Sequence, residues 1–155
     1  MALTLIISEI DIRQESAQIY GAHAILDLKG CSLLQLGQLA SIKRIKVFAS
    51  YIQESWPGRI KGLHVINEPL CVHYLCHFLR SLLSEKLRER FHVYGDDIKS
   101  LQKYISPDVL PAELGGTAEP INDCEYKSYI LNQEPYFEKL NQYGFRSNFV
   151  IDETI

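Results

Sequence analysis

Apolar residues in the first part of the chain recur at intervals that distinguish helices from strands. A spacing of three or four residues predicts one helix over 3–19 and a longer one over 33–55. The longer helix is expected to bend near Gly37 and to end before Pro57. Between the two helices, residues 22–30 alternate loosely between apolar and polar and end in glycine, which is typical of a strand.

The central stretch predicts two strands that flank two contrasting helices. Residues 60–66 form a short apolar run that is stopped by Pro69, as expected of a buried strand. The helix over 70–80 lies in a segment with a single charge, so it must be buried or face something other than water. A basic helix over 84–90 and a short strand over 91–94 follow. Strands that alternate with helices in this way predict an α/β layer fold.

The last third of the chain is expected to be less regular. A small helix over 97–105, capped by its leading aspartates, precedes a proline- and glycine-rich return across the surface. Apolar residues at helical spacing over 126–140 are interrupted by Pro135, which predicts two short helices. Residues 144–155 are expected to form a loose tail.

Composition and charge restrict the class of protein. The chain has 155 residues, of which 46% are hydrophobic and 23% charged, as in an ordinary globular domain. A net charge of -3 argues against nucleic acid as a partner, so any anion site must be a local cluster. We expect a cytoplasmic protein, since no segment is typical of a signal peptide or a membrane span. Its cysteines are expected to be reduced thiols in the core: Cys31, Cys71, Cys76 and Cys124.

A pair of histidines is the most suggestive feature for metal chemistry. His73 and His77 are four residues apart on one helical face, with Cys71 and Cys76 nearby, as in some zinc sites. The glutamate of the metalloprotease motif is absent, and the sequence places no third ligand, so packing is the favoured interpretation. The chain also has no nucleophile-elbow serine and no phosphate-binding glycine loop with lysine. We therefore predict no catalytic residues, no metal, no cofactor and no enzymatic activity.

Two pairs of cationic residues flank the apolar helix. Arg59 and Lys61 are two apart at the start of a strand and are expected to point to the same side. Lys86 and Arg90 are four apart on one face of the basic helix. Each residue alone is consistent with a solvated surface, and the four together favour an anion-binding patch.

The order of these segments resembles the CRAL-TRIO lipid-binding domain, in particular the branch with alpha-tocopherol transfer protein and the cellular retinaldehyde-binding protein. The similarity covers about residues 1–120 and is carried by the runs GAHAILDLKG, SWPG, RIKGLHVINEP, SEKLRERFHVYG and VLPAELGG. Each run alone is unspecific, whereas the ordered combination is specific.

The resemblance implies a mixed β-sheet backed by helices, with a lid helix over an apolar pocket. The lid would run from Pro69 to Leu83 and contact the membrane through Leu75, Phe78 and Leu82. Phosphoinositide headgroups would bind Arg59, Lys61, Lys86 and Arg90. The pocket would be lined by Ala24, Leu26, Phe48, Tyr51, Ile52, Trp56, Leu63, Val65, Leu79 and Leu83.

The chain departs from the family pattern at its start. Family members normally open with a helical lobe and a first strand, and this sequence opens at the helix that follows them. We therefore expect a sheet with an unpaired edge strand. The expected organisation is an N-terminally truncated lipid-binding domain over 1–122, helices over 123–143 and a flexible tail over 144–155.

Two functions follow from this interpretation. The leading one is binding and intermembrane transfer of a small hydrophobic ligand, tocopherol-, retinoid- or phospholipid-like, by a cytoplasmic protein that associates transiently with phosphoinositide-containing membranes. The alternative is a degenerate interaction module that has kept the sheet and lost ligand exchange. Co-purified lipid would distinguish them.

Overall fold

The computed structural model describes residues 9–32, 34, 35, 37, 41–120 and 122–143. The chain divides into two compact units. One unit consists of Asp11–Ile121 and contains the sheet, and the other combines Met1–Ile10 with Asn122–Ile155. The two units are described separately below.

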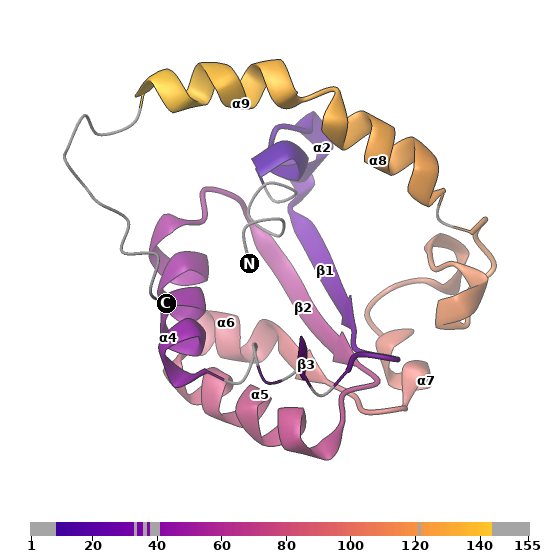
Figure 1. Ribbon diagram of the computed structural model, residues 1–155. Coiled ribbons are helices and arrows are strands. Elements are labelled where there is room, and N and C mark those ends of the chain that lie inside the picture. Colours follow the sequence, from indigo (N-terminus) through magenta and orange to yellow (C-terminus); the bar gives the residue numbers. More distant parts are fainter. Residues whose placement is uncertain (1–8, 33, 36, 38–40, 121, 144–155) are drawn as a thin grey trace. The chain divides into compact units, whose positions relative to one another are not determined.

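A three-stranded sheet forms the centre of the larger unit (Figure 1). Its strands are β1 (Ala22–Asp27), β2 (Ile60–Ile66) and β3 (Phe91–Val93), paired in the order β1-β2-β3. Both pairings are parallel, and no antiparallel strand occurs among the described residues, so the mixed sheet implied by the resemblance is not seen. As expected, β1 is an edge strand of the described sheet, and its side chains are largely exposed.

Parallel neighbours need long crossover connections, and the helices supply them. The chain passes from β1 to β2 through α4 (Ile42–Ser50) and the π-helix η1 (Tyr51–Ser55). It passes from β2 to β3 through α5 (Leu70–Leu82) and α6 (Glu85–Arg90). This alternation confirms the predicted α/β class.

Side chains alternate across the sheet and divide its residues between two faces. Leu63 pairs with Ala24 and Phe91, and Val65 pairs with Leu26 and Val93, so these residues share the face toward α4, α5 and α6. The helices bury this face in the main apolar cluster of the protein, which we call the helix-side core. Its buried members are Leu28, Ala49, Ile52, Ile60, Val65, Val72, Cys76, Leu83, Leu87 and Phe91.

The opposite face is covered by the segment that follows β3. Ile66 is buried there against Leu101 and Leu110, which belong to α7 (Ile98–Leu101) and to the loop after η2 (Pro107–Val109). A further short helix, η3 (Ala112–Leu114), ends at Gly115, whose φ of 73° favours glycine. The predicted aspartate cap is confirmed, because the Asp97 side chain accepts from the backbone N–H of Ser100. The helix predicted over 97–105 is shorter than expected.

Both long helices predicted in the first part of the chain are interrupted. Residues 9–12 are helical, but Gln14 is extended and a new helix, α2 (Glu15–Tyr20), starts after it. Similarly, Ser41 is extended immediately before α4. Apolar spacing does not reveal whether the backbone is continuous, so the pattern gave no sign of either break. Residues 3–8 and most of 33–40, including both neighbours of Gly37 where the bend was predicted, lie outside the described residues.

The smaller unit contains the two short helices predicted near the C-terminus. They are α8 (Asp123–Leu131) and α9 (Glu134–Leu140), followed by the 3₁₀ turn η4 (Asn141–Tyr143). Pro135 lies in the first turn of α9, where a missing backbone N–H costs nothing. Within this unit the Tyr136 hydroxyl donates to Glu9 Oε1 over 2.9 Å. The tail predicted over 144–155 lies outside the described residues.

Candidate ligand and anion sites

The predicted pocket residues gather in one region of the larger unit. All of them except Ala24 and Leu26 belong to the helix-side core or pack against it. Ile52, Val65 and Leu83 are buried, and the remaining members are half-buried around them. The structure thus brings together side chains from α4, η1, β2 and α5 in a single apolar layer, although the sequence separates them widely.

Ala24 and Leu26 are placed differently from the rest. They lie on the same face of the sheet, but on the edge strand, and Leu26 is 51% exposed. Within the described part of the chain no element covers this end of the face. The two residues are therefore positioned beside the helix-side core and are not part of it.

The segment that carries Tyr51 and Ile52 has an unusual backbone. After α4 the helix widens into η1, a π-helical turn over Tyr51–Ser55. Such turns are rare and are frequently found at functional sites. Here the widened turn lets the Tyr51 ring meet Trp56 edge to face, with ring centroids 6.0 Å apart.

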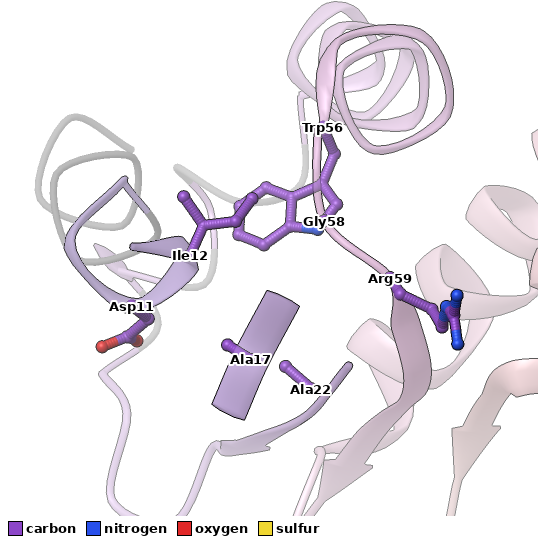
Figure 2. Close-up of a pocket in the computed structure, with 7 residues that line it drawn as sticks. All are labelled: Asp11, Ile12, Ala17, Ala22, Trp56, Gly58 and Arg59. Carbon is purple, nitrogen blue, oxygen red and sulfur yellow. The ribbon is translucent and has the colours of Figure 1, made fainter. Parts of the chain in front are cut away.

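Trp56 also closes a small cavity at the start of β2 (Figure 2). The cavity has a volume of about 20 Å³, and Figure 2 shows the Ile12 side chain against the Trp56 indole. Gly58 permits this packing, since a Cβ there would lie 2.7 Å from Trp56 Nε1 and 2.8 Å from Ile12 Cδ1. A space of this size accommodates about one water molecule and is far below the ~300 Å³ of ordinary ligand pockets.

The expected lid corresponds to α5, whose exposed stripe differs from the predicted one. Leu75, Phe78 and Leu82 are all half-buried, and Leu82 packs against the helix-side core. The most exposed apolar side chains of α5 are instead Leu70 at 72% and Tyr74 at 68%. Helical spacing could have indicated them, because they lie opposite the buried Val72 and Cys76.

The turn between β2 and α5 is held by a buried carboxylate. Glu68 accepts from the backbone N–H of Gly95, with both of its oxygens 2.9 Å from that nitrogen. Its Oε1 also lies 3.1 Å from His73 Nδ1 on the first turns of α5. The preceding Asn67 has a φ of 53° and donates its side-chain amide to Asp27. These bonds tie the beginning of α5 to the ends of all three strands.

Three of the four predicted phosphoinositide residues lie close together. A Cβ on Gly21 would lie 3.2 Å from Arg59 Cβ and 3.0 Å from Lys61 Cγ, so these two side chains start side by side over that glycine. The Arg90 guanidinium donates to the backbone carbonyl of Ile60, the residue between them. Lys86 is exposed one helical turn before Arg90. We call Arg59, Lys61, Lys86 and Arg90 the strand-side patch.

Sequence reasoning missed a row of histidines on the sheet face away from the helices. His23, His64 and His92 come from β1, β2 and β3, and the stacked rings of His64 and its two neighbours have centroids 5.3 Å apart on each side. His64 Nε2 lies 3.0 Å from His23 Nδ1, and His64 Nδ1 lies 2.9 Å from the Tyr94 hydroxyl. One histidine in each predicted strand was the signal that could have indicated this row.

Burial strongly changes the protonation of this row. His64 is only 1% exposed, and burial, reinforced by His23 and His92, lowers its pKa from 6.5 to about 4. The pKa values of His23 and His92 are lowered as well, mainly by burial and then by the charges of Lys61 and Arg80 respectively. Burial, with a contribution from Tyr104, raises the pKa of Tyr94 to about 12. The row is therefore neutral at physiological pH.

The His73 and His77 pair does not form a metal site with the described residues. His73 Nε2 lies 3.1 Å from His77 Nε2, but the nearest carboxylate, Glu68, contacts the other nitrogen of His73. No cluster of three or more candidate ligands occurs in the described part of the chain. The pair is explained by a hydrogen-bond chain from Glu68 along α5.

The expectation that all cysteines are core thiols is only partly correct. All four are free, but Cys71 and Cys124 are exposed and Cys31 is half-buried. Cys76 is buried in the helix-side core, where burial raises the pKa of its thiol to about 11. Cys71 lies on the exposed side of α5, which faces away from the sheet.

Comparison with known proteins adds family information to this geometry. Residues 1–116 match the model of the CRAL/TRIO domain. The chain is 33% identical over 144 residues to Clavesin-1 of Xenopus laevis, covering 92% of this chain and 42% of that protein. It is 31% identical over 128 residues to "Alpha-tocopherol transfer protein-like" of Mus musculus, covering 83% of this chain and 37% of that protein. The chain thus spans about two fifths of the length of the curated relatives it matches.

No helix among the described residues is long and apolar enough to cross a membrane.

Proposed function

Because the chain belongs to the CRAL/TRIO domain family, we propose that it binds one small hydrophobic ligand and transfers it between membranes. The family is one of binding proteins that generally take lipophilic ligands and are not enzymes, in agreement with the prediction of no enzymatic activity. The observation that carries the proposal is the gathering of the predicted pocket residues in one apolar layer between sheet and helices. We expect the ligand to be tocopherol-, retinoid- or phospholipid-like.

Burial of apolar surface alone cannot explain why a ligand would leave a membrane for such a carrier. Burying ~400 Å² of ligand gains roughly 10 kcal/mol relative to water at ~25 cal/mol per Å². A bilayer offers the ligand nearly the same gain, so the protein must select by fit and release by opening. In our proposal α5 is the element that opens, because its exposed side carries apolar residues, Leu70 and Tyr74, that could meet lipid.

The strand-side patch supports recognition of a phosphoinositide headgroup. Arg59 and Lys61 start side by side, and the Arg90 guanidinium donates to the carbonyl of the residue between them. In the part of the chain that the structure describes, no carboxylate forms an ion pair with any of the four patch residues. Since the protein has a net charge of -3, this patch would supply attraction to an anionic membrane locally.

Organic extraction of the purified protein followed by mass spectrometry tests ligand binding directly. We expect a single class of lipid at near-stoichiometric amount. Extraction that yields none from protein purified out of a lipid-containing host would contradict the carrier proposal. That result would instead favour the alternative of an interaction module, for which the exposed edge strand β1 is the supporting feature.

Vesicle sedimentation with and without phosphatidylinositol bisphosphate tests the patch. Arg59→Ala/Lys86→Ala should weaken the binding roughly 30-fold, since each cation near an anionic surface contributes ~1 kcal/mol. Lys43→Ala/Lys46→Ala removes the same charge from the exposed side of α4 and serves as the control. Equal losses in both double variants would show general charge attraction and not a patch. We further expect the protein to be cytoplasmic and only transiently bound to membranes.

A further inference from the structure

A second cationic feature lies on the other flank of α6. An open groove of about 380 Å³ is lined by His77, Arg80, Ser81 and Arg88. The first three belong to the last turns of α5, and Arg88 comes from α6. The groove is separate from the strand-side patch, whose α6 members, Lys86 and Arg90, do not line it.

The fold divides the basic run of α6 between two sites. Alternate cations in a helix point in nearly opposite directions, because successive residues are 100° apart. Arg90 therefore reaches the Ile60 carbonyl at β2, whereas Arg88 donates from Nη2 to the Leu83 carbonyl over 3.0 Å at the end of α5. This bond positions the Arg88 guanidinium at the groove, and no described residue accepts a hydrogen bond from its other N–H donors.

The groove concentrates positive charge without compensating it. Neither Arg80 nor Arg88 has a carboxylate at ion-pair distance within the described part of the chain, although Glu85 and Glu89 are on the same short helix as Arg88. The Ser81 hydroxyl is already bonded to the Phe78 carbonyl over 2.7 Å, so the two guanidinium groups are the main donors. Both arginines line the same space, and the planar fork of an arginine side chain matches the oxygen geometry of a phosphate group.

The exposed side of α5 is apolar at its beginning and reaches the groove at its end. Leu70 and Tyr74 are strongly exposed, and His77 and Ser81 continue the same stripe at spacings of three and four residues. An aromatic residue followed by cations is the order expected where a helix passes from the acyl region to the headgroup level. The position of the groove therefore favours a phosphate carried by a lipid over one in solution.

We propose that the groove between α5 and α6 is a second phosphate-binding site, in which Arg80 and Arg88 bind a phosphomonoester group of an anionic lipid headgroup. The site stands on its own residues and does not depend on ligand transfer or on the strand-side patch. A protein with both sites would bind two headgroups, one on each flank of α6.

Calorimetric titration of the full chain with soluble inositol trisphosphate counts the sites. We expect two equivalents bound by the parent and one by either Arg80→Gln/Arg88→Gln or Arg59→Gln/Lys86→Gln. One equivalent in the parent that only Arg59→Gln/Lys86→Gln abolishes would overturn the groove site. One equivalent that only Arg80→Gln/Arg88→Gln abolishes would support the groove and reject the strand-side patch.

Vesicles distinguish a membrane-bound phosphate from a soluble one. Arg80→Gln/Arg88→Gln should weaken sedimentation with phosphatidylinositol bisphosphate about tenfold or more, and it should change binding to phosphatidylserine vesicles of equal charge much less. A loss on vesicles without any binding of the soluble probe would support the site and assign it to lipid alone. An equal loss with Lys43→Gln/Lys46→Gln would overturn it, because general attraction would then explain the effect.

Two further variants guard against a folding artefact. Arg88→Gln removes the bond to the Leu83 carbonyl and could disturb folding. Arg80→Gln alone is the cleaner test, because the Arg80 side chain forms no hydrogen bond with a described residue. It should lower the affinity of the groove at least threefold with an unchanged unfolding temperature. Arg80→Lys/Arg88→Lys keeps the charge without the forks and should restore part of the affinity. Full affinity in Arg80→Gln would contradict the proposal.

Discussion

The two faces of the sheet are stabilised by different interactions, apolar contacts on one and hydrogen bonds between side chains on the other. Val65 faces the helices and is buried in an apolar cluster, whereas its neighbour His64 faces the other way and has a hydrogen-bonding partner at each ring nitrogen. Apolar contacts have no preferred direction and tolerate rearrangement, while hydrogen bonds fix distances and angles. The histidine side is therefore suited to hold the strands in register, and the helix side is the one that we propose to open for a ligand.

The close approach of a glycine shows how tightly the histidine side is built. A Cβ on Gly62 would lie 2.4 Å from His64 Nε2 and 2.6 Å from His23 Nδ1. Only a residue without a side chain leaves room for the bond between these two rings. On the helix-covered face the contacts are apolar instead, and Leu63 packs half-buried against the helix-side core.

The largest effect is expected from emptying the helix-side core. Phe91 is 3% exposed on β3, and Phe91→Ala should lower the free energy of unfolding by about 3–5 kcal/mol through lost burial and a residual cavity. Urea unfolding followed by circular dichroism measures the change. Tyr74→Ala, on the exposed stripe of α5, is the control and should change it by less than about 0.5 kcal/mol. A small effect of Phe91→Ala would show that this layer is not packed.

The second largest effect is expected in the pH dependence of the free energy of unfolding, which reports on the histidine side of the sheet. Because the folded pKa of His64 is depressed to about 4, the unfolded chain binds a proton more readily between pH 6.5 and 4. The stabilisation by neutral His64 is complete above pH 6.5 and should be lost as the pH falls, by about 3 kcal/mol in all. Unfolding curves measured across this range give the slope.

The variant His64→Gln tests the origin of that slope. It should be less stable at neutral pH, because the bonds to His23 and Tyr94 are disturbed, yet its stability should change less between pH 6.5 and 4. His23 and His92 have lowered pKa values too and should retain part of the dependence. An unchanged slope in the variant would assign the pH dependence to other groups.

The smallest effect on stability is expected at the open end of the helix-covered face. Ala24 is exposed on the edge strand, so Ala24→Trp should be accommodated without overpacking and shift the free energy of unfolding by less than about 0.5 kcal/mol. If the ligand extends over this edge, the indole should still reduce the amount of co-purified lipid. Thermal unfolding and lipid extraction of the same preparation separate the two quantities. A destabilisation above about 1 kcal/mol would show that Ala24 is packed in solution.

Local pattern was sufficient for several parts of the fold and the site. The strand over Ile60–Ile66, the apolar helix after it and the two short C-terminal helices were predicted correctly, because their signals lie within a few consecutive residues. The Asp97 cap has the same local character. The family resemblance rested on the order of such segments, and the match over residues 1–116 confirms it.

Tertiary structure decided what depends on neighbours that are distant in the chain. It separated Arg88 from Lys86 and Arg90, although they are two residues apart, because the two flanks of α6 face different elements. It aligned His23, His64 and His92, whose relation is set by strand register and not by spacing. It also exposed Ala24 and Leu26 at an edge, since the same alternating pattern is buried or open depending on what covers it. The sequence alone determined the class of each element and the apolar side it offers, and the packing of those elements determined which polar groups meet.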